Sequence, residues 1–99
     1  MKSLLQTERE CYLTGRRDNL HRHHIYGGGR RALSEKYGLW VYLTGEMHNL
    51  SPAGVHFNRA LDRQLKQAGQ RAFENAYSRE AFLRLFGKNY LENEGELKA

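Results

Sequence analysis

The first half of the chain alternates short apolar and polar stretches in a way that predicts β-strands. Residues 11–15 and residues 20–25 are short mixed segments on either side of turn-forming residues at 15–19, which predicts a β-hairpin. Residues 39–43 combine aromatic and β-branched side chains and give the strongest strand signal in the chain. Residues 1–10 are polar, and we expect them to fray or to form a short helical lead.

Helical spacing follows in the middle of the chain. Residues 31–37 can form two turns of helix that Gly38 would terminate, and residues 44–46 predict a turn. Ser51 and Pro52 are typical of a helix N-cap and first helical residue, although Gly54 favours a regular helix that begins nearer residue 55 and extends to residue 76. The predicted apolar face of this helix contains Phe57, Leu61, Leu65, Ala68 and Ala72, and its polar side contains Asp62, Arg63, Lys66, Gln67 and Gln70.

A last helix is expected from the N-cap Ser78 to about Phe86, with Gly87 ending it. Its predicted apolar face consists of Phe82, Leu85 and Phe86. This order of strands and helices is typical of a small α+β domain. Ninety-nine residues make one domain, with a core at about 11–76, the last helix at about 78–87 and an acidic tail at 88–99.

The formal net charge of the chain is +5, and the basic residues are concentrated in its middle. Basic residues surround a pair of histidines at positions 23 and 24 and continue after residue 58, whereas acidic residues gather near the C-terminus. A basic middle indicates a polyanionic partner, since each neutralised phosphate releases counterions. Ordinary solubility charge is the alternative explanation.

Cysteine content and hydropathy exclude several classes of protein. The single cysteine, Cys11, excludes an internal disulfide and a four-cysteine zinc site. No apolar run approaches the roughly 20 residues that a membrane span needs, and no signal peptide is visible. We therefore expect no membrane partner and a cytoplasmic location.

Four of the five histidines carry the candidate chemistry. His23 and His24 close the strand at residues 20–25, and His48 and His56 follow it. Imidazole is the commonest nitrogen ligand for metals and the side chain that titrates nearest neutrality, so this group can supply metal ligands and a general base. Successive strand side chains point to opposite faces, so only a bend at the strand end would bring the rings of His23 and His24 to one site. His21, by contrast, is expected to be structural or solvent-facing.

The segment from Cys11 to about Gln70 resembles the HNH, or His-Me finger, endonucleases, whose active site is a ββα-metal motif. It is most similar to small phage-borne members of that family. The resemblance is carried by four stretches, which are residues 20–28, 33–39, 41–48 and 54–58. It implies a small ββα-metal domain with a β-hairpin and a long helix, to which this chain adds a C-terminal helix.

The resemblance also implies a role for each histidine. His24 corresponds to the general base that deprotonates the attacking water, and His23 and His48 correspond to metal ligands. A further ligand comes from the helix that follows, which nominates His56, with Asn58 supplying or supporting it. One divalent metal ion is implied, with Mg²⁺ or Mn²⁺ supporting activity and Zn²⁺ or Ni²⁺ able to occupy the site.

The chain departs from the family pattern in three ways. Many members carry two Cys-x-x-Cys pairs for a structural zinc, but here the equivalent positions are Cys11, Thr14, Thr44 and Met47, so no structural zinc is expected. The family asparagine that orients the base is missing from residues 32–43, and a backbone carbonyl near Gly38 is the suggested substitute. His48 and His56 are eight residues apart, so residues 49–55 must loop back for both to reach one ion.

Two groups of basic residues are candidates for DNA contact. Arg22, Arg30 and Arg31 lie near the histidine pair and could clamp phosphates that flank the cleaved bond. Arg59, Arg63 and Lys66 are spaced four and three apart, which predicts a stripe along the long helix that contacts backbone phosphates. A solvated surface arginine is the alternative for each, and the glycine run at 27–29 is either a flexible loop or a phosphate cradle.

The sequence thus predicts a metal-dependent endonuclease that hydrolyses DNA phosphodiester bonds, encoded by a phage or prophage. A catalytically inactive, metal-binding nucleic-acid adaptor is the main alternative, and a structural protein-interaction module is a third. The sequence leaves open whether the DNA is duplex, nicked, branched or single-stranded, which metal is used, and whether the chain forms a homodimer or binds a phage protein.

Overall fold

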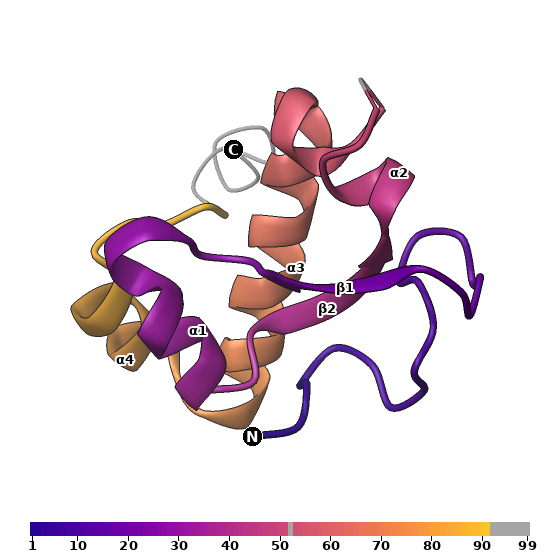
Figure 1. Ribbon diagram of the computed structural model, residues 1–99. Helices are drawn as coiled ribbons and strands as arrows, with labels where there is room; N and C mark the ends of the chain where they lie inside the picture. Colours follow the sequence, from indigo (N-terminus) through magenta and orange to yellow (C-terminus); the bar gives the residue numbers. More distant parts are fainter. Residues whose placement is uncertain (52, 92–99) are drawn as a thin grey trace.

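The computed structural model describes residues 1–51 and 53–91, and it folds as a small α+β unit, as predicted (Figure 1). Helix α3 runs behind the two strands, α1 and α4 lie at one side, and α2 lies at the other. The elements follow in the order β1 (Leu20–His24), η1 (Gly28–Arg30), α1 (Arg31–Lys36), β2 (Trp40–Thr44), α2 (Gly45–His48), η2 (Val55–Phe57), α3 (Arg59–Ala76) and α4 (Arg79–Phe86), where η1 and η2 are 3₁₀ turns.

The sheet consists of β1 and β2, which pair antiparallel with His21 opposite Leu43 and His24 opposite Trp40. The predicted hairpin between residues 11–15 and 20–25 is therefore wrong. Residues 11–15 form a turn in which the Gly15 amide donates to the Cys11 carbonyl at 2.8 Å. Gly15 has a φ of +78°, a left-handed conformation that turns the chain instead of extending it. The strand at 40–44 can bury side chains on both of its faces, and it takes the place beside β1.

The N-terminal segment lies along β2 and is neither frayed nor helical. The Leu4 amide donates to the Gly38 carbonyl at 2.8 Å, and the Gln6 side chain accepts from the Tyr42 amide at 2.6 Å. The Trp40 indole donates to the Met1 carbonyl at 3.1 Å. These bonds satisfy polar groups at the edge of β2 that would otherwise remain open for pairing.

The helix ends follow local rules, except at the start of α3. Gly38 and Gly87 adopt left-handed φ values of +70° and +73° after α1 and α4, as their positions predicted. Ser78 accepts from the Ala81 amide at the start of α4, which confirms its role as N-cap. Helix α3 begins later than expected, because Asn58 accepts from the Leu61 amide at 3.1 Å and caps it.

The structure differs from the sequence-based expectation in two places between residues 44 and 57. Residues 55–57 form the separate turn η2 and not the first turn of α3, and Pro52 lies outside the described residues. The turn predicted at 44–46 is instead the beginning of α2.

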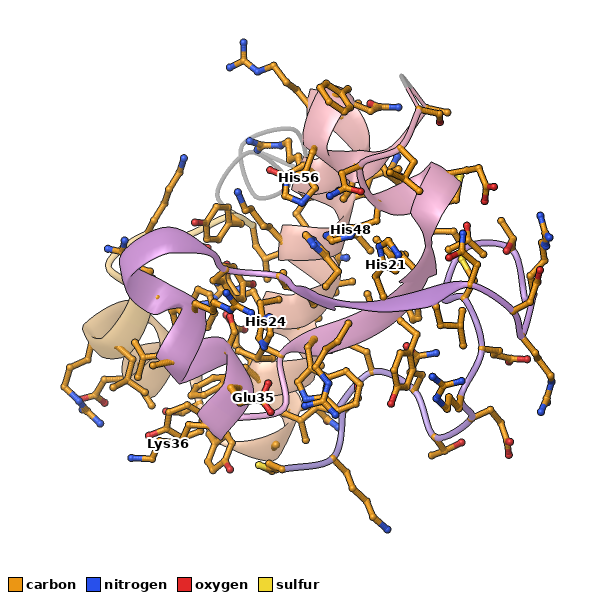
Figure 2. All side chains as sticks on the ribbon, in the orientation of Figure 1. His21, His24, Glu35, Lys36, His48 and His56 are labelled. Carbon is orange, nitrogen blue, oxygen red and sulfur yellow. The ribbon has the colours of Figure 1, made fainter. Side chains whose placement is uncertain are left out.

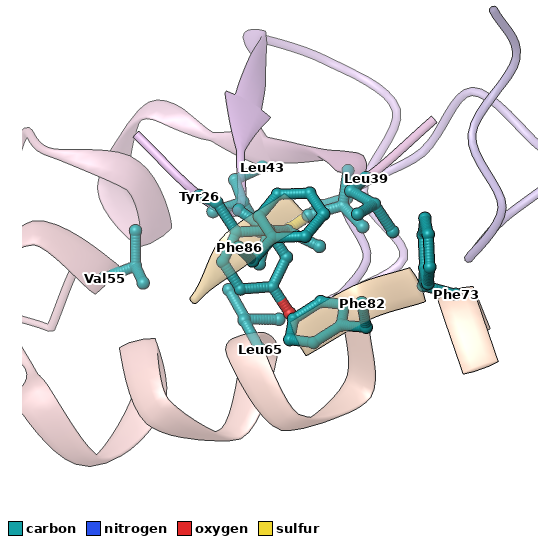
Figure 3. Packing of buried hydrophobic residues seen from close by; sticks show 11 residues of the cluster. Tyr26, Leu39, Leu43, Val55, Leu65, Phe73, Phe82 and Phe86 are labelled. Atoms are coloured by element: carbon teal, nitrogen blue, oxygen red, sulfur yellow. The ribbon is translucent and has the colours of Figure 1, made fainter. Parts of the chain in front are cut away.

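The core lies between the sheet, α3 and α4 (Figure 3). Leu65 and Phe73 of α3 are buried, and Phe73 packs edge-to-face on Phe82 of α4 with ring centroids 5.6 Å apart. Gly69 lets the segment after β1 approach α3 closely, because a Cβ there would lie 2.9 Å from the Tyr26 hydroxyl. The buried face of α3 thus centres on residues 65, 69 and 73, and is rotated from the predicted stripe.

Two predicted positions on the long helix were wrong. Phe57 was expected in the apolar face but is 66% exposed, because it lies in η2 before the helix begins. Gln70 was expected on the polar side but is fully buried. Its side chain accepts from the Tyr90 amide at 2.7 Å and donates to Asn89 at 2.9 Å, which ties the chain after α4 to α3.

The predicted acidic tail at 88–99 is described only as far as Leu91, which is buried, and its remaining residues lie outside the described part. Within residues 1–51 and 53–91, no helix is long and apolar enough to cross a membrane.

Candidate metal centre

Three histidines from three different elements converge on one point. His23 comes from β1, His48 ends α2, and His56 lies in η2. One ring nitrogen from each of them lies within 4.8 Å of those of the other two. The ring centroids are 5.3 Å apart for His23 and His48, 5.6 Å for His23 and His56, and 4.7 Å for His48 and His56. We call these three residues the histidine trio.

The chain between His48 and His56 loops back, as the spacing of eight residues required. Gly54 makes this possible, because a Cβ at this position would lie 2.8 Å from the His48 carbonyl oxygen and 2.9 Å from that of Glu46. The Gly54 amide also donates to the Ser51 carbonyl at 2.9 Å. A glycine is therefore needed where the backbone passes closest to α2 and delivers His56 to the trio.

Burial keeps two of the three rings neutral. His23 is 6% exposed, and burial together with the neighbouring His48 and His56 lowers its pKa to about 4. The pKa of His48 is also lowered to about 4, first by burial and then by His56 and His21. Imidazole binds a metal only in its neutral form, so both rings are ready to act as ligands at neutral pH.

The donor set fits a divalent metal ion. The Nε2 atom of His23 is buried and has no hydrogen-bond partner among the described residues, which is costly unless another group satisfies it. His56 is exposed, so the trio opens to solvent on one side. Three protein nitrogens with an open side are typical of a catalytic site, whereas structural zinc sites are closed by four protein ligands. Histidine nitrogens alone do not select one metal.

His24 lies on the opposite side of β1 from the trio, so the bend that would join both rings of the pair is not observed. Figure 2 shows His24 and Glu35 on one side of the strand and His48 and His56 on the other. The His24 Nε2 atom lies 2.6 Å from Glu35 Oε2. Arg22 donates to the other Glu35 oxygen at 2.5 Å, and its guanidinium lies 3.8 Å from the centre of the Trp40 ring.

Sequence reasoning missed Glu35 as the partner of His24. The suggested backbone carbonyl near Gly38 accepts instead from the Leu4 amide at 2.8 Å. Glu35 is eleven residues from His24, and only the docking of α1 beside β1 brings the two together. The hydrogen bond from His24 is the main reason that the pKa of Glu35 is lowered, and nearby Arg22 lowers it further.

His21 was also missed, since it was expected to be structural or solvent-facing. Its Nδ1 atom lies 3.1 Å from Nδ1 of His48, so it touches one member of the trio directly. Strand alternation, which places His21 and His23 on the same side of β1, was the available signal.

The predicted phosphate-binding arginines near the pair fall into two groups. Arg22 and Arg31 line a hollow of about 580 Å³ together with His24 and Glu35. Arg30 points elsewhere, because its Nε donates to the Phe86 carbonyl at 2.8 Å and so satisfies the C-terminal end of α4. The glycines at 28 and 29 also line the hollow, in and around the turn η1.

The predicted stripe on α3 is brought together as expected. Arg59, Arg63 and Lys66 line a second hollow of about 340 Å³, to which Lys88 adds a cation that the sequence pattern did not indicate. Lys66 is paired with Asp62 at 2.8 Å within the same hollow. Asn58 has a structural role as the cap of α3, and its assignment as a metal ligand stays a prediction.

Comparison with known proteins gives no match: no family model, curated protein or solved structure matches this chain.

Proposed function

We propose that this chain is a metal-dependent endonuclease of the HNH type that hydrolyses phosphodiester bonds in DNA. The observation that carries the proposal is the histidine trio, whose three rings converge and include a buried His23 nitrogen without a partner among the described residues. The expected ligands His23, His48 and His56 are the three residues of this cluster. The type of reaction is inferred from the family resemblance, and the trio is a candidate metal site that fits this reaction.

The residues have two tasks at one phosphate, which would lie across the end of β1 where His23 and His24 adjoin. The trio would hold a divalent ion, which would supply Lewis-acid stabilisation of charge on the phosphate and on the leaving oxygen. His24 takes the proton from the attacking water, which is the task of a general base. Glu35 holds Nε2 of His24 at 2.6 Å, so Nδ1 is the nitrogen left to accept that proton. The water oxygen forms the new bond to phosphorus as the bond to the leaving oxygen breaks.

Glu35 would then do the work of the missing family asparagine. An ionised carboxylate accepts a hydrogen bond from Nε2–H of His24, which fixes the ring orientation and leaves the lone pair on Nδ1. Arg22 holds the second carboxylate oxygen of Glu35 and rests on Trp40, so the carboxylate is itself held in place.

The positions that carry zinc cysteines in many HNH proteins are a point at which this chain departs from the resemblance. Cys11 is buried, and burial by itself would raise the pKa of its thiol. Hydrogen bonds with the Thr14 side chain and the Thr44 backbone instead lower that pKa overall. Three of the four equivalent positions, Cys11, Thr14 and Thr44, are therefore neighbours in the structure.

The basic hollows favour a nucleic-acid substrate. One hollow places Arg22 and Arg31 beside His24, where they could hold phosphates that flank the cleaved bond. The second places Arg59, Arg63, Lys66 and Lys88 around one depression on α3. Contacts of this kind fix the position of a DNA backbone and read little sequence.

Cleavage of DNA by the purified protein tests the proposal. Supercoiled plasmid and nicked, branched and single-stranded oligonucleotides are incubated with Mg²⁺ or Mn²⁺, and with EDTA as the metal-free control. We expect metal-dependent cleavage that His24→Ala lowers by about 10²- to 10⁴-fold and that Arg84→Ala, at an exposed site on α4, leaves unchanged. Binding of metal and DNA with no cleavage of any substrate would favour the inactive adaptor, and absence of metal binding would favour the structural module.

A further inference from the structure

We propose that His21 is a positioning residue for the metal site, and that it fixes which nitrogen of His48 faces the ion. The inference rests on the proposed metal site, and it adds a residue that is not one of the three ligands. Its basis is the contact of 3.1 Å between Nδ1 of His21 and Nδ1 of His48 (Figure 2).

The fold places His21 at this point through the register of the sheet. His21 lies two residues before His23 on β1, so both side chains leave the strand on the same side. It pairs with Leu43 of β2, and the chain turns into α2 two residues after Leu43. The short helix then returns His48 over the strand, where the two rings meet edge-on with centroids 5.3 Å apart and planes at 80°.

The contact couples the tautomer of His48 to that of His21. A hydrogen bond between two neutral rings needs one proton and one lone pair. If Nδ1 of His48 carries the proton and donates it to His21, then Nε2 of His48 keeps its lone pair for the ion. Metal-binding histidines almost always donate their second N–H to an acceptor in this way, which fixes the ring and raises the basicity of the ligating nitrogen. His21 is that acceptor.

The effect of a substitution on metal affinity distinguishes His21 from the three proposed ligands. Loss of a ligand removes a bond to the ion, whereas loss of an outer partner costs about 10- to 100-fold in metal affinity. Asparagine has its side-chain oxygen near the place that Nδ1 occupies in histidine, so His21→Asn keeps an acceptor for His48. A residue that acted only through packing would not be rescued by an acceptor.

Two measurements test the proposal. The first is long-range ¹H–¹⁵N NMR on the metal-free protein, which reports the tautomer of each histidine. We expect His48 to carry its proton on Nδ1 in the wild type and in His21→Asn, and to lose this preference in His21→Ala. The second is Zn²⁺ and Mn²⁺ titration by calorimetry, in which His21→Ala should bind about 10- to 100-fold more weakly, His21→Asn nearly normally, and Arg84→Ala normally.

The outcomes separate this inference from the metal site itself. A His48 proton on Nε2 in the wild type, or unchanged affinity in His21→Ala, overturns the positioning role. Complete loss of binding in His21→Ala, equal to that in His48→Ala, makes His21 a ligand and also overturns it. If wild type and His48→Ala bind metal equally, the proposed metal site fails, while the tautomer measured in the metal-free protein still decides whether His21 fixes the ring of His48.

Discussion

His23 and His24 are neighbours in strand β1, yet their rings serve opposite faces of the sheet. His23 points to His48 and His56, and His24 points to Glu35 of α1. This follows from the alternation of a regular strand, which continues to the second residue of the pair. The two histidines therefore have separable roles, and single substitutions should reveal them.

We expect His24→Ala to lower DNA cleavage by about 10²- to 10⁴-fold, the usual contribution of a general base. Metal affinity and DNA affinity should stay near normal, because His24 is not part of the trio. His23→Ala should instead abolish metal binding. Calorimetric metal titration and a plasmid-nicking assay on both variants check this. Loss of metal binding in His24→Ala would show that the roles of the two residues are reversed.

Glu35 should be needed for the orientation of His24 and little needed for the fold. Glu35→Ala should slow cleavage by roughly 10- to 100-fold, less than the loss of the base itself. Glu35→Gln should keep most of the activity, because its amide oxygen can still accept from Nε2 of His24. The free energy of unfolding should change by less than about 1 kcal/mol, since the ion pair with Arg22 is partly exposed. Equal loss of cleavage in both variants would argue for a charge effect and against positioning.

Local signals in the sequence predicted several helix ends. Elements that depend on contacts between residues far apart in the chain were not predicted. Gly38, Ser78 and Gly87 mark helix ends through their own backbone preferences, so α1 and α4 could be read directly. The partner of β1 could not, because residues 11–15 and 40–44 both carry strand-like side chains and only packing selects one. The late start of α3 has a local cause instead, because the Asn58 side-chain oxygen accepts from the Leu61 amide and caps the helix.

The three histidines of the candidate site could be predicted from the sequence, whereas the residues that contact and orient the site histidines could not. The family resemblance named His23, His48 and His56, and the structure brings these three together. Glu35 was invisible because its contact with His24 depends on how α1 docks beside the sheet. Buried Gln70 was missed for a related reason, since its partners come from the chain after α4.

Divalent metals should stabilise the protein by binding only the folded state. At a metal concentration 100 times the dissociation constant, this adds about 2.7 kcal/mol and raises the melting temperature. Thermal unfolding with Zn²⁺, Ni²⁺ or Mn²⁺ should show the shift in wild type and lose it in His48→Ala and His56→Ala. Gly54→Ala should also reduce the shift, because a Cβ there displaces the backbone that delivers His56. No shift with any of these ions at saturation would rule out the trio as a metal site.

The metal-free protein should lose stability as the pH falls from about 6.5 to about 4. His23 has its pKa lowered to about 4 by burial and by His48, His56 and His24, against the opposing effect of Asp62. Between these pH values the unfolded chain binds a proton at His23 that the folded protein excludes, so this contribution is lost within the window and is on the order of 3 kcal/mol.

Urea unfolding in EDTA at pH 7, 5.5 and 4.5 measures this dependence. Other groups titrate in the same range, so the comparison with His23→Gln isolates the contribution of His23. We expect the variant to show a smaller fall in its free energy of unfolding across this range. An identical fall in both proteins would mean that His23 is not held neutral by the fold.

The basic stripe on α3 should bind DNA phosphates without reading sequence. Arg59 and Arg63 line one hollow with Lys66 and Lys88, and replacing both arginines by alanine removes two of its cations. Affinity should fall about equally for all DNA sequences, and the slope of log affinity against log salt should flatten by roughly one unit per lost contact. Fluorescence anisotropy at several salt concentrations measures both effects, with Arg84→Ala as the matched control. If affinity and salt slope are unchanged, the DNA backbone is held instead by the turn at 16–17 and the loop at 30–31, and α3 faces away from it.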